Sequence, residues 1–270
     1  MDAPLIYTTP YYERIRSFEE RHWWYVGMRS FQGALYRAYA GPDAWPRRAL
    51  DAGCGTGATM SWLEEQYPGI KVVGVDIASD AVQLCRQEHS GVNQGSVLQL
   101  PYPDDTYDLV ISQDVIQHLP TEGGDTQALR EMLRVLRPGG IALIRSNSRL
   151  GMGHTAEERD HDFQRYLLPE LKSRFEDAGF TRFHGTYANA LPAVYATLKR
   201  RLRRRSSGVG KAQSTLYEGL GVRDTAAKSP LLNRILMRWM RVEAWYVSKP
   251  GRALPFGHST ICLGTKPPPA

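Results

Sequence analysis

Short apolar runs and helical patterns alternate through the middle of the chain. Apolar runs at 48–50, 71–75, 92–98, 107–112 and 141–145 predict buried strands, and residues 180–187 and 258–266 alternate like two more. Helical spacing predicts helices at 58–67, 79–88, 122–136 and 168–179. Because strands that alternate with helices form parallel sheets covered on both faces, we predict an α/β fold with a doubly wound, seven-stranded, mostly parallel sheet.

The two flanking regions carry other patterns. Helices are expected at 11–25 and 28–40, before a turn-rich linker. Residues 231–246 predict an amphipathic helix, with an apolar face at Leu232, Ile235, Leu236, Trp239, Val242 and Tyr246 and a basic face at Arg234, Arg238 and Arg241. We therefore divide the chain into an N-terminal helical region (1–46), a core (47–188), a helical insertion (189–257) and the last core strand with its tail (258–270).

A glycine-rich turn follows the first core strand, in Leu50-Asp51-Ala52-Gly53-Cys54-Gly55-Thr56-Gly57. Strand, glycine turn and helix form the first unit of nucleotide-binding folds, where bare backbone and helix amides face a ligand. Asp76 ends the second strand, 21 residues after Gly55. A carboxylate there is placed to accept hydrogen bonds from both ribose hydroxyls of an adenosine, although it could instead cap the following helix.

Two adenosine cofactors compete for this turn. Gly53-x-Gly55-x-x-Ala58 fits the dinucleotide pattern of an NAD-dependent oxidoreductase. However, Gly57 creates a third glycine, and Asp51 would repel a pyrophosphate. A carboxylate suits a ligand that carries an ammonium group and no phosphate, which favours S-adenosylmethionine (SAM).

Four ordered blocks carry a resemblance to a known family. They are Asp-Ala-Gly-Cys-Gly-Thr-Gly from Asp51, Val-Gly-Val-Asp-Ile from Val73, Leu-Pro-Tyr-Pro-Asp-Asp-Thr-Tyr-Asp-Leu-Val from Leu100 and Leu-Arg-Pro-Gly-Gly from Leu136. Together they resemble a class I SAM-dependent methyltransferase with a Rossmann-like fold, from Leu50 to about Ile144. The resemblance implies an antiparallel strand near one sheet edge and a set of cofactor-binding residues: Trp24, Arg29, Asp51, Gly53, Cys54, Gly55, Gly57, Asp76, Ile77, Ser96, Val97 and Gln113.

The segment His22-Trp23-Trp24-Tyr25-Val26-Gly27-Met28-Arg29 is similar to one that precedes the core in related small-molecule methyltransferases. The resemblance implies a lid over the cofactor, with Arg29 near the methionine carboxylate. Alternatively, the tryptophans pack the helices on the sheet. Ser96 departs from the family, which commonly has an acid there for the adenine amino group. A hydroxyl can still accept that bond, more weakly.

Two histidines are candidate general bases. His118 follows the fourth strand, where ligands bind in open α/β sheets, but it could equally pack beside the cofactor or cap a helix. His161 lies in a polar loop at 146–163, and loops above the crevice commonly contact substrate. We expect no metal site in this loop, because the adjacent Asp160, His161 and Asp162 would point in different directions.

Charge is unevenly distributed. Residues 189–257 carry 14 Lys/Arg and three Asp/Glu, although the whole chain has a net charge of only +6. We expect a helical cover for the core or a homodimer contact there. A pocket for an acidic substrate and a peripheral membrane contact through 190–205 and 231–246 remain alternatives. The basic run lacks a known aromatic platform, which disfavours nucleic acid.

Three dispersed cysteines, the absence of a signal-peptide pattern and the absence of roughly 20-residue apolar runs favour a cytoplasmic protein. We expect methyl transfer from SAM to a small-molecule acceptor, with oxygen favoured, in a biosynthetic pathway such as that of a natural product. The alternatives are transfer to carbon or nitrogen of a hydrophobic or lipid-like acceptor, or a SAM-binding protein without transfer activity.

Overall fold

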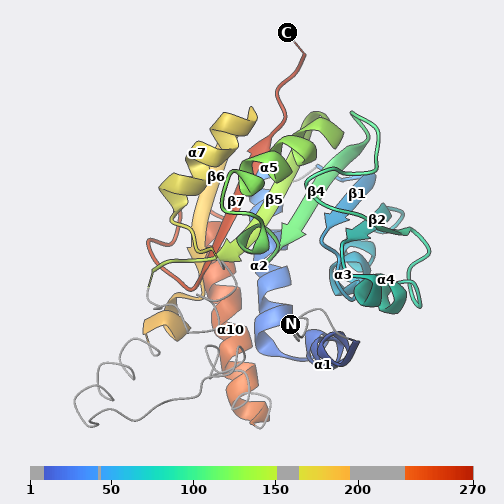
Figure 1. Ribbon diagram of the computed structural model, residues 1–270. Helices are drawn as coiled ribbons and strands as arrows, with labels where there is room; N and C mark the ends of the chain where they lie inside the picture. Colours follow the sequence, from blue (N-terminus) through green and yellow to red (C-terminus); the bar gives the residue numbers. More distant parts are fainter. Residues whose placement is uncertain (1–8, 42–43, 151–163, 195–228, 270) are drawn as a thin grey trace, which may run out of the picture.

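One seven-stranded sheet forms the centre of the computed structural model, which describes residues 9–41, 44–150, 164–194 and 229–269 (Figure 1). The strand order is β3-β2-β1-β4-β5-β7-β6, and only β7 runs antiparallel to its neighbours β5 and β6. The strands are β1 (Arg48–Ala52), β2 (Lys71–Asp76), β3 (Val92–Gln94), β4 (Tyr107–Gln113), β5 (Leu136–Asn147), β6 (Thr181–Ala188) and β7 (Ser259–Thr265). The predicted α/β sheet and its antiparallel strand are confirmed.

Helices cover both faces of this sheet. They include α1 (Thr9–Glu19), α2 (Trp23–Ala40), α3 (Ala58–Gln66), α4 (Ser79–Cys85), α5 (Gly124–Val135), α7 (Leu168–Ala178) and α10 (Pro230–Val247), with a short 3₁₀ turn η2 (Ile116–His118). Residues of α2, α3 and α10 share one apolar core with the sheet, and α5 and α7 share the other. None of the described helices is long and apolar enough to cross a bilayer.

The central strand β4 shows why its sequence is continuously apolar. Leu109 and Ile111 pack in the core beneath α2, α3 and α10, whereas Val110 packs in the core beneath α5 and α7. Successive side chains of a strand point to opposite faces, so a strand covered on both sides has no solvent-facing positions. All residues of β4 before Gln113 are accordingly buried.

The N-terminal helices begin and end elsewhere than predicted. Instead of one helix over 11–25, α1 ends at Glu19 and α2 begins at Trp23. The break comes from His22, whose Nδ1 accepts a hydrogen bond from the Trp24 amide at 3.3 Å and so caps α2. Trp23 and Trp24 are both buried within α2.

Two core strands also differ in length from the prediction. β3 ends at Gln94, so Ser96 and Val97 lie in the loop beyond it. β5 runs from Leu136 to Asn147 and is therefore longer at both ends than the predicted strand 141–145.

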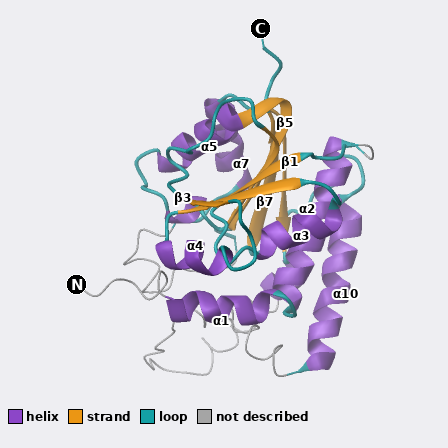
Figure 2. Ribbon diagram, turned by 90° about the vertical axis from the view of Figure 1, so that its right-hand side faces the viewer, coloured by secondary structure: helices purple, strands orange, loops and turns teal. Residues whose placement is uncertain are grey.

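Helix α10 packs on α2, and Figure 2 shows the two side by side. The buried side chains of α10 are Leu236, Met240, Glu243, Ala244 and Val247. A Cβ on Gly27 of α2 would lie 2.8 Å from Met240 Cγ, so only glycine permits this close approach. The predicted apolar face was therefore only partly right: Leu236 and Leu232 pack on the core, whereas Ile235, Trp239, Val242 and Tyr246 are exposed.

Glu243 fastens α10 to the end of β6. Its carboxylate accepts hydrogen bonds from the amides of Asn189 at 2.9 Å and Ala190 at 3.0 Å. It also accepts one from Trp239 Nε1 at 2.6 Å. Burial raises the pKa of Glu243, and these donors oppose the shift. Removing the carboxylate would leave three donors without an acceptor, two of them in a buried environment.

We expect Glu243→Ala to lower the free energy of unfolding by about 3 kcal/mol, which corresponds to roughly 10 °C in Tm. Thermal unfolding monitored by circular dichroism measures this. Glu176→Ala, which removes an exposed carboxylate of α7, is the matched control. Equal melting temperatures for the two variants would contradict the anchoring role.

Candidate functional site

The glycine turn lies at the carboxyl end of β1, between Ala52 and the start of α3. Gly53, Gly55 and Gly57 all have positive φ, at 90°, 53° and 92°. A Cβ on Gly53 would stand 2.2 Å from Val115 Cγ2, whereas a Cβ on Gly55 would meet no atom within 4 Å. The turn is thus packed tightly at its first glycine and open at its second, where a ligand can lie against the backbone.

Asp76 and Ile77 lie beside this turn, at the end of β2. Asp76 Oδ2 accepts a hydrogen bond from the Gly55 amide at 2.9 Å, and Oδ1 accepts one from the Ala78 amide at 2.9 Å. Burial raises the pKa of Asp76, and these amides oppose the shift. Each carboxylate oxygen retains a lone pair for a hydroxyl donor. Ile77 is 64% exposed, which leaves an apolar surface next to the acid.

Asp51 is buried beneath the glycine turn, with 2% of its surface exposed. Burial raises its pKa to about 8, and the nearby carboxylates of Asp76 and Glu19 act in the same direction. Arg145 opposes these effects. Three neighbouring acids close to one arginine form a site that favours a cationic ligand over a phosphate. Cys54, next in the turn, is a buried thiol.

The loop after β3 carries two further predicted cofactor residues, Ser96 and Val97. Ser96 Oγ accepts a hydrogen bond from the Leu98 amide at 3.1 Å. Its hydroxyl therefore already has one donor and retains one lone pair and its proton. Val97 is buried in the apolar core beneath α5 and α7.

A partly buried ion pair connects the end of β4 with Trp24. Arg145 of β5 pairs with Asp114 at 2.6 Å, and its guanidinium lies 4.6 Å from the centre of the Trp24 ring. Gln113 Nε2 donates a hydrogen bond to Thr59 Oγ1 at 3.0 Å. Arg145 was not among the predicted site residues, although an arginine that ends the apolar run 141–145 was a usable signal.

The N-terminal helices reach the glycine turn through polar contacts. The Thr56 hydroxyl donates to the Glu19 carboxylate, and Arg29 Nη2 donates to the Glu19 carbonyl oxygen at 2.5 Å. Burial raises the pKa of Glu19. Arg16 of α1 pairs with Glu88, beyond the end of α4.

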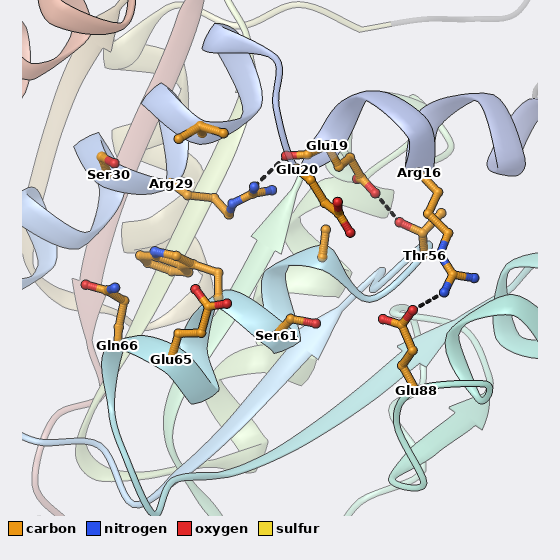
Figure 3. Close-up of a pocket in the computed structure, with 13 residues that line it drawn as sticks. Arg16, Glu19, Glu20, Arg29, Ser30, Thr56, Ser61, Glu65, Gln66 and Glu88 are labelled. Carbon is orange, nitrogen blue, oxygen red and sulfur yellow. Dashed lines mark hydrogen bonds and ion pairs between the residues drawn. The ribbon is translucent and has the colours of Figure 1, made fainter.

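These residues line a cavity of about 500 Å³ between α1, α2 and α3 (Figure 3). Figure 3 shows Arg29 and Glu20 extending into it from the helix side, opposite Ser61 and Glu65 of α3. The cavity therefore adjoins the glycine turn on the side of the N-terminal helices. One of the Arg29 donors is already used in its hydrogen bond to the Glu19 carbonyl oxygen.

Of the two candidate bases, only His118 lies within the described residues. His118 lies in η2, shortly after the end of β4, and is exposed. Desolvation lowers its pKa, and Asp114 opposes this shift. The imidazole is therefore neutral near pH 7 and able to accept a proton. His161 lies outside the described residues.

Several of the predicted cofactor residues lie at the carboxyl ends of neighbouring strands, whereas only Arg29 among them lines the 500 Å³ cavity. Asp51, Asp76 and the glycines meet at the ends of β1 and β2, and Trp24 lies against Arg145. The open backbone, the paired acceptors and the buried acids suit a ribose and a cationic amino acid moiety. These donors and acceptors fit SAM.

Comparison with known families agrees with this geometry. Residues 50–144 match the model of a family described as a methyltransferase domain. The chain is 31% identical over 137 residues to norajmaline N-methyltransferase of Rauvolfia serpentina. The aligned stretch covers 48% of this chain and 46% of that protein. It is 34% identical over 114 residues to fatty-acid O-methyltransferase of Mycolicibacterium smegmatis, and this aligned stretch covers 40% of this chain and 40% of that protein.

The chain thus aligns with less than half the length of these two curated relatives. Among solved structures, it resembles a putative methyltransferase in complex with the Haloferax volcanii Trm112 methyltransferase activator. That match has a TM-score of 0.61 and 19% identity, and it covers 96% of this chain and 97% of the other. At this identity the match demonstrates a shared fold.

We expect Asp76→Ala to weaken SAM binding by about 2 kcal/mol, roughly 30-fold in Kd. The variant loses the acceptor for the ribose hydroxyls, and titration calorimetry measures the change. Asp177→Ala on the exposed face of α7 is the control, and a melting curve checks that the glycine turn stays folded. Unchanged affinity would exclude the ribose contact.

We also expect SAM affinity to depend on pH through Asp51. Its raised pKa means that the cofactor-free protein holds this carboxyl protonated below about pH 8, whereas a cationic ligand favours the ionised form. Affinity should therefore fall up to about tenfold per pH unit below that value. Calorimetry in buffers of different ionisation enthalpy should detect the released proton. Asp51→Asn should bind more weakly and lose this pH dependence.

Proposed function

Because the chain belongs to the class I SAM-dependent methyltransferases, we propose that it transfers the methyl group of SAM to an oxygen atom of a small-molecule acceptor. The observation that carries this proposal is the buried Asp51 carboxylate beneath the open glycine turn, next to Asp76. This arrangement is suited to a nucleoside ligand that carries positive charge.

Each wall of the crevice has a proposed role in holding the cofactor. Asp76 accepts both ribose hydroxyls, and the exposed Ile77 packs against one face of the adenine. Ser96, with Val97 behind it, contacts the adenine edge. Asp51 attracts the methionine ammonium group, and Gln113 lines the crevice beside Thr59. The methionine carboxylate lies near Arg29, after its hydrogen bond to Glu19 exchanges for one to the ligand.

SAM supplies an already activated methyl group, so the chain must position the acceptor and exclude water. We place the methionine end of the cofactor beside Trp24 and Arg145, whose stacked indole and guanidinium would form an apolar and a charged wall. An acceptor hydroxyl must lose its proton during transfer. We assign this role to His118, whose lowered pKa keeps it neutral, with His161 as a second candidate.

Residues 1–46 serve as a lid in this proposal. Thr9 of α1 is hydrogen-bonded to Asp80 of α4 at 2.5 Å, and Glu19 is bonded to Thr56 of the glycine turn. α1 therefore bridges the starts of α3 and α4, over the crevice formed by the core (47–188). Release of these exposed and partly buried contacts would open a path for the cofactor.

The atom methylated is the finer part of the proposal. One relative's name specifies N-methylation and another's specifies O-methylation, so the relatives leave both acceptor atoms open. Transfer to nitrogen or carbon of a hydrophobic acceptor is the alternative within the enzyme class. SAM binding without transfer is the alternative outside it.

Titration calorimetry with SAM, its demethylated product and NAD tests the cofactor. We expect binding of the first two and none of NAD, and binding of NAD alone would overturn the proposal. Incubation with SAM and candidate acceptors, followed by mass spectrometry, should then reveal a gain of one methyl group on a hydroxyl compound. Gain only on amines would move the acceptor to nitrogen, and SAM binding without any methylated product across acceptor classes would favour a binding protein.

We expect His118→Gln to lower kcat for hydroxyl acceptors by about 100-fold or more, while the Kd for SAM stays unchanged. The loss should shrink for acceptors that are already ionised at the assay pH, because they need no base. His184→Gln, which replaces a half-buried histidine of β6, is the matched control. Equal activity of both variants would remove His118 from proton transfer.

A further inference from the structure

Helix α10 presents a large apolar surface to the outside of the protein. While one side of α10 packs on α2, the opposite side exposes Leu231 (68%), Ile235 (51%), Val242 (52%) and Trp245 (59%), and to a lesser degree Trp239 and Tyr246. Figure 2 shows α10 at the edge of the molecule, beyond α2. Isolated exposed apolar residues are normal, but a continuous stripe along a helix indicates a binding surface.

A row of arginines runs beside this apolar stripe. Arg234, Arg238 and Arg241 recur at helical spacing and are all exposed. Glu243 is the one acid among the 18 residues of α10, and it is buried in the contact with Asn189 and Ala190. The outer surface of α10 is therefore purely apolar and cationic.

Two cations that follow α10 lie over aromatic rings of its last turn. Lys249 Nζ lies 5.3 Å from the centre of the Trp245 ring, and the Arg252 guanidinium lies 5.1 Å from that of Tyr246. Indole and phenol rings next to basic side chains suit the boundary between lipid headgroups and acyl chains, where one end of each group is apolar and the other hydrated.

We propose that the outer face of α10 binds the surface of an anionic lipid membrane. The apolar stripe enters the boundary of the acyl chains, and the arginine row contacts acidic headgroups. The segment around α10 has the matching charge, with 14 basic and three acidic residues in 189–257. Since α10 is not apolar enough to span a bilayer, it lies along the surface.

A second copy of the chain fits this face less well. A twofold dimer places the same patch against itself, so the arginine rows of both copies would enter one interface. No exposed acid on α10 is available to neutralise them. An anionic lipid surface supplies that charge without the need for a complementary protein patch.

Vesicle sedimentation with the full chain tests this proposal. Phosphatidylcholine vesicles with and without phosphatidylglycerol are compared at low and high salt. We expect binding to the anionic vesicles and its loss at high salt. Because each cation near an anionic surface contributes about fivefold, Arg234→Gln/Arg238→Gln/Arg241→Gln should lower the partition coefficient about 100-fold.

Two further variants separate α10 from general charge. Arg48→Gln/Lys71→Gln/Lys172→Gln removes the same charge from exposed positions outside α10 and should bind nearly as wild type. Ile235→Ser/Val242→Ser keeps every charge and should also bind weakly. The proposal is overturned if the Arg234/Arg238/Arg241 variant binds as well as the Arg48/Lys71/Lys172 control. It is also overturned if wild type binds equally to vesicles with and without phosphatidylglycerol. Wild type could instead form a dimer in sedimentation velocity and fail to bind vesicles. If Ile235→Ser/Val242→Ser then dissociates that dimer, the face belongs to a contact with a second copy. None of these readouts depends on methyl transfer.

Discussion

A buried cation organises the crevice at the carboxyl ends of the central strands. Arg145 pairs with Asp114, stacks on Trp24 and influences the pKa values of Asp51 and Glu19. It therefore joins β4, β5 and α2 at one point. Removing either partner of such a pair would leave an uncompensated charge in a poorly solvated site. The ion pair thus fixes the wall against which cofactor and acceptor are expected to meet.

More acids than cations lie around Arg145, so the site favours a positively charged ligand. Asp51 and Asp76 are held close together by β1, β2 and the glycine turn, since the Asp76 carboxylate is bonded to the Gly55 amide. Burial raises the pKa values of both acids, so ionising them costs free energy. A bound cation offsets that cost because it stabilises the ionised carboxylates. Recognition and folding are therefore coupled through the same carboxylates.

Helix α10, in the region after β6, packs one face on the core and exposes the other. Glu243 and Met240 connect α10 to the core, and the arginine row points away from it. One helix can do both because its buried and exposed faces are separated by half a turn. The chain thereby attaches a cationic apolar surface to the same sheet that carries the crevice, without altering the strand order.

Local sequence determined the sheet, the glycine turn and the acid at the end of β2. These depend on short-range patterns: continuous apolar runs, positive-φ glycines and an acid at a fixed spacing from Gly55. Only the tertiary structure decided the orientation of α10, the break at His22 and the place of Arg145. Both faces of α10 contain apolar residues, so periodicity alone favoured Ile235 and Val242 for the core, whereas close packing at Gly27 and the buried Glu243 selected the Met240 face. Arg145 gains its partners from β4 and α2, and such long-range contacts leave no periodic signal in the chain.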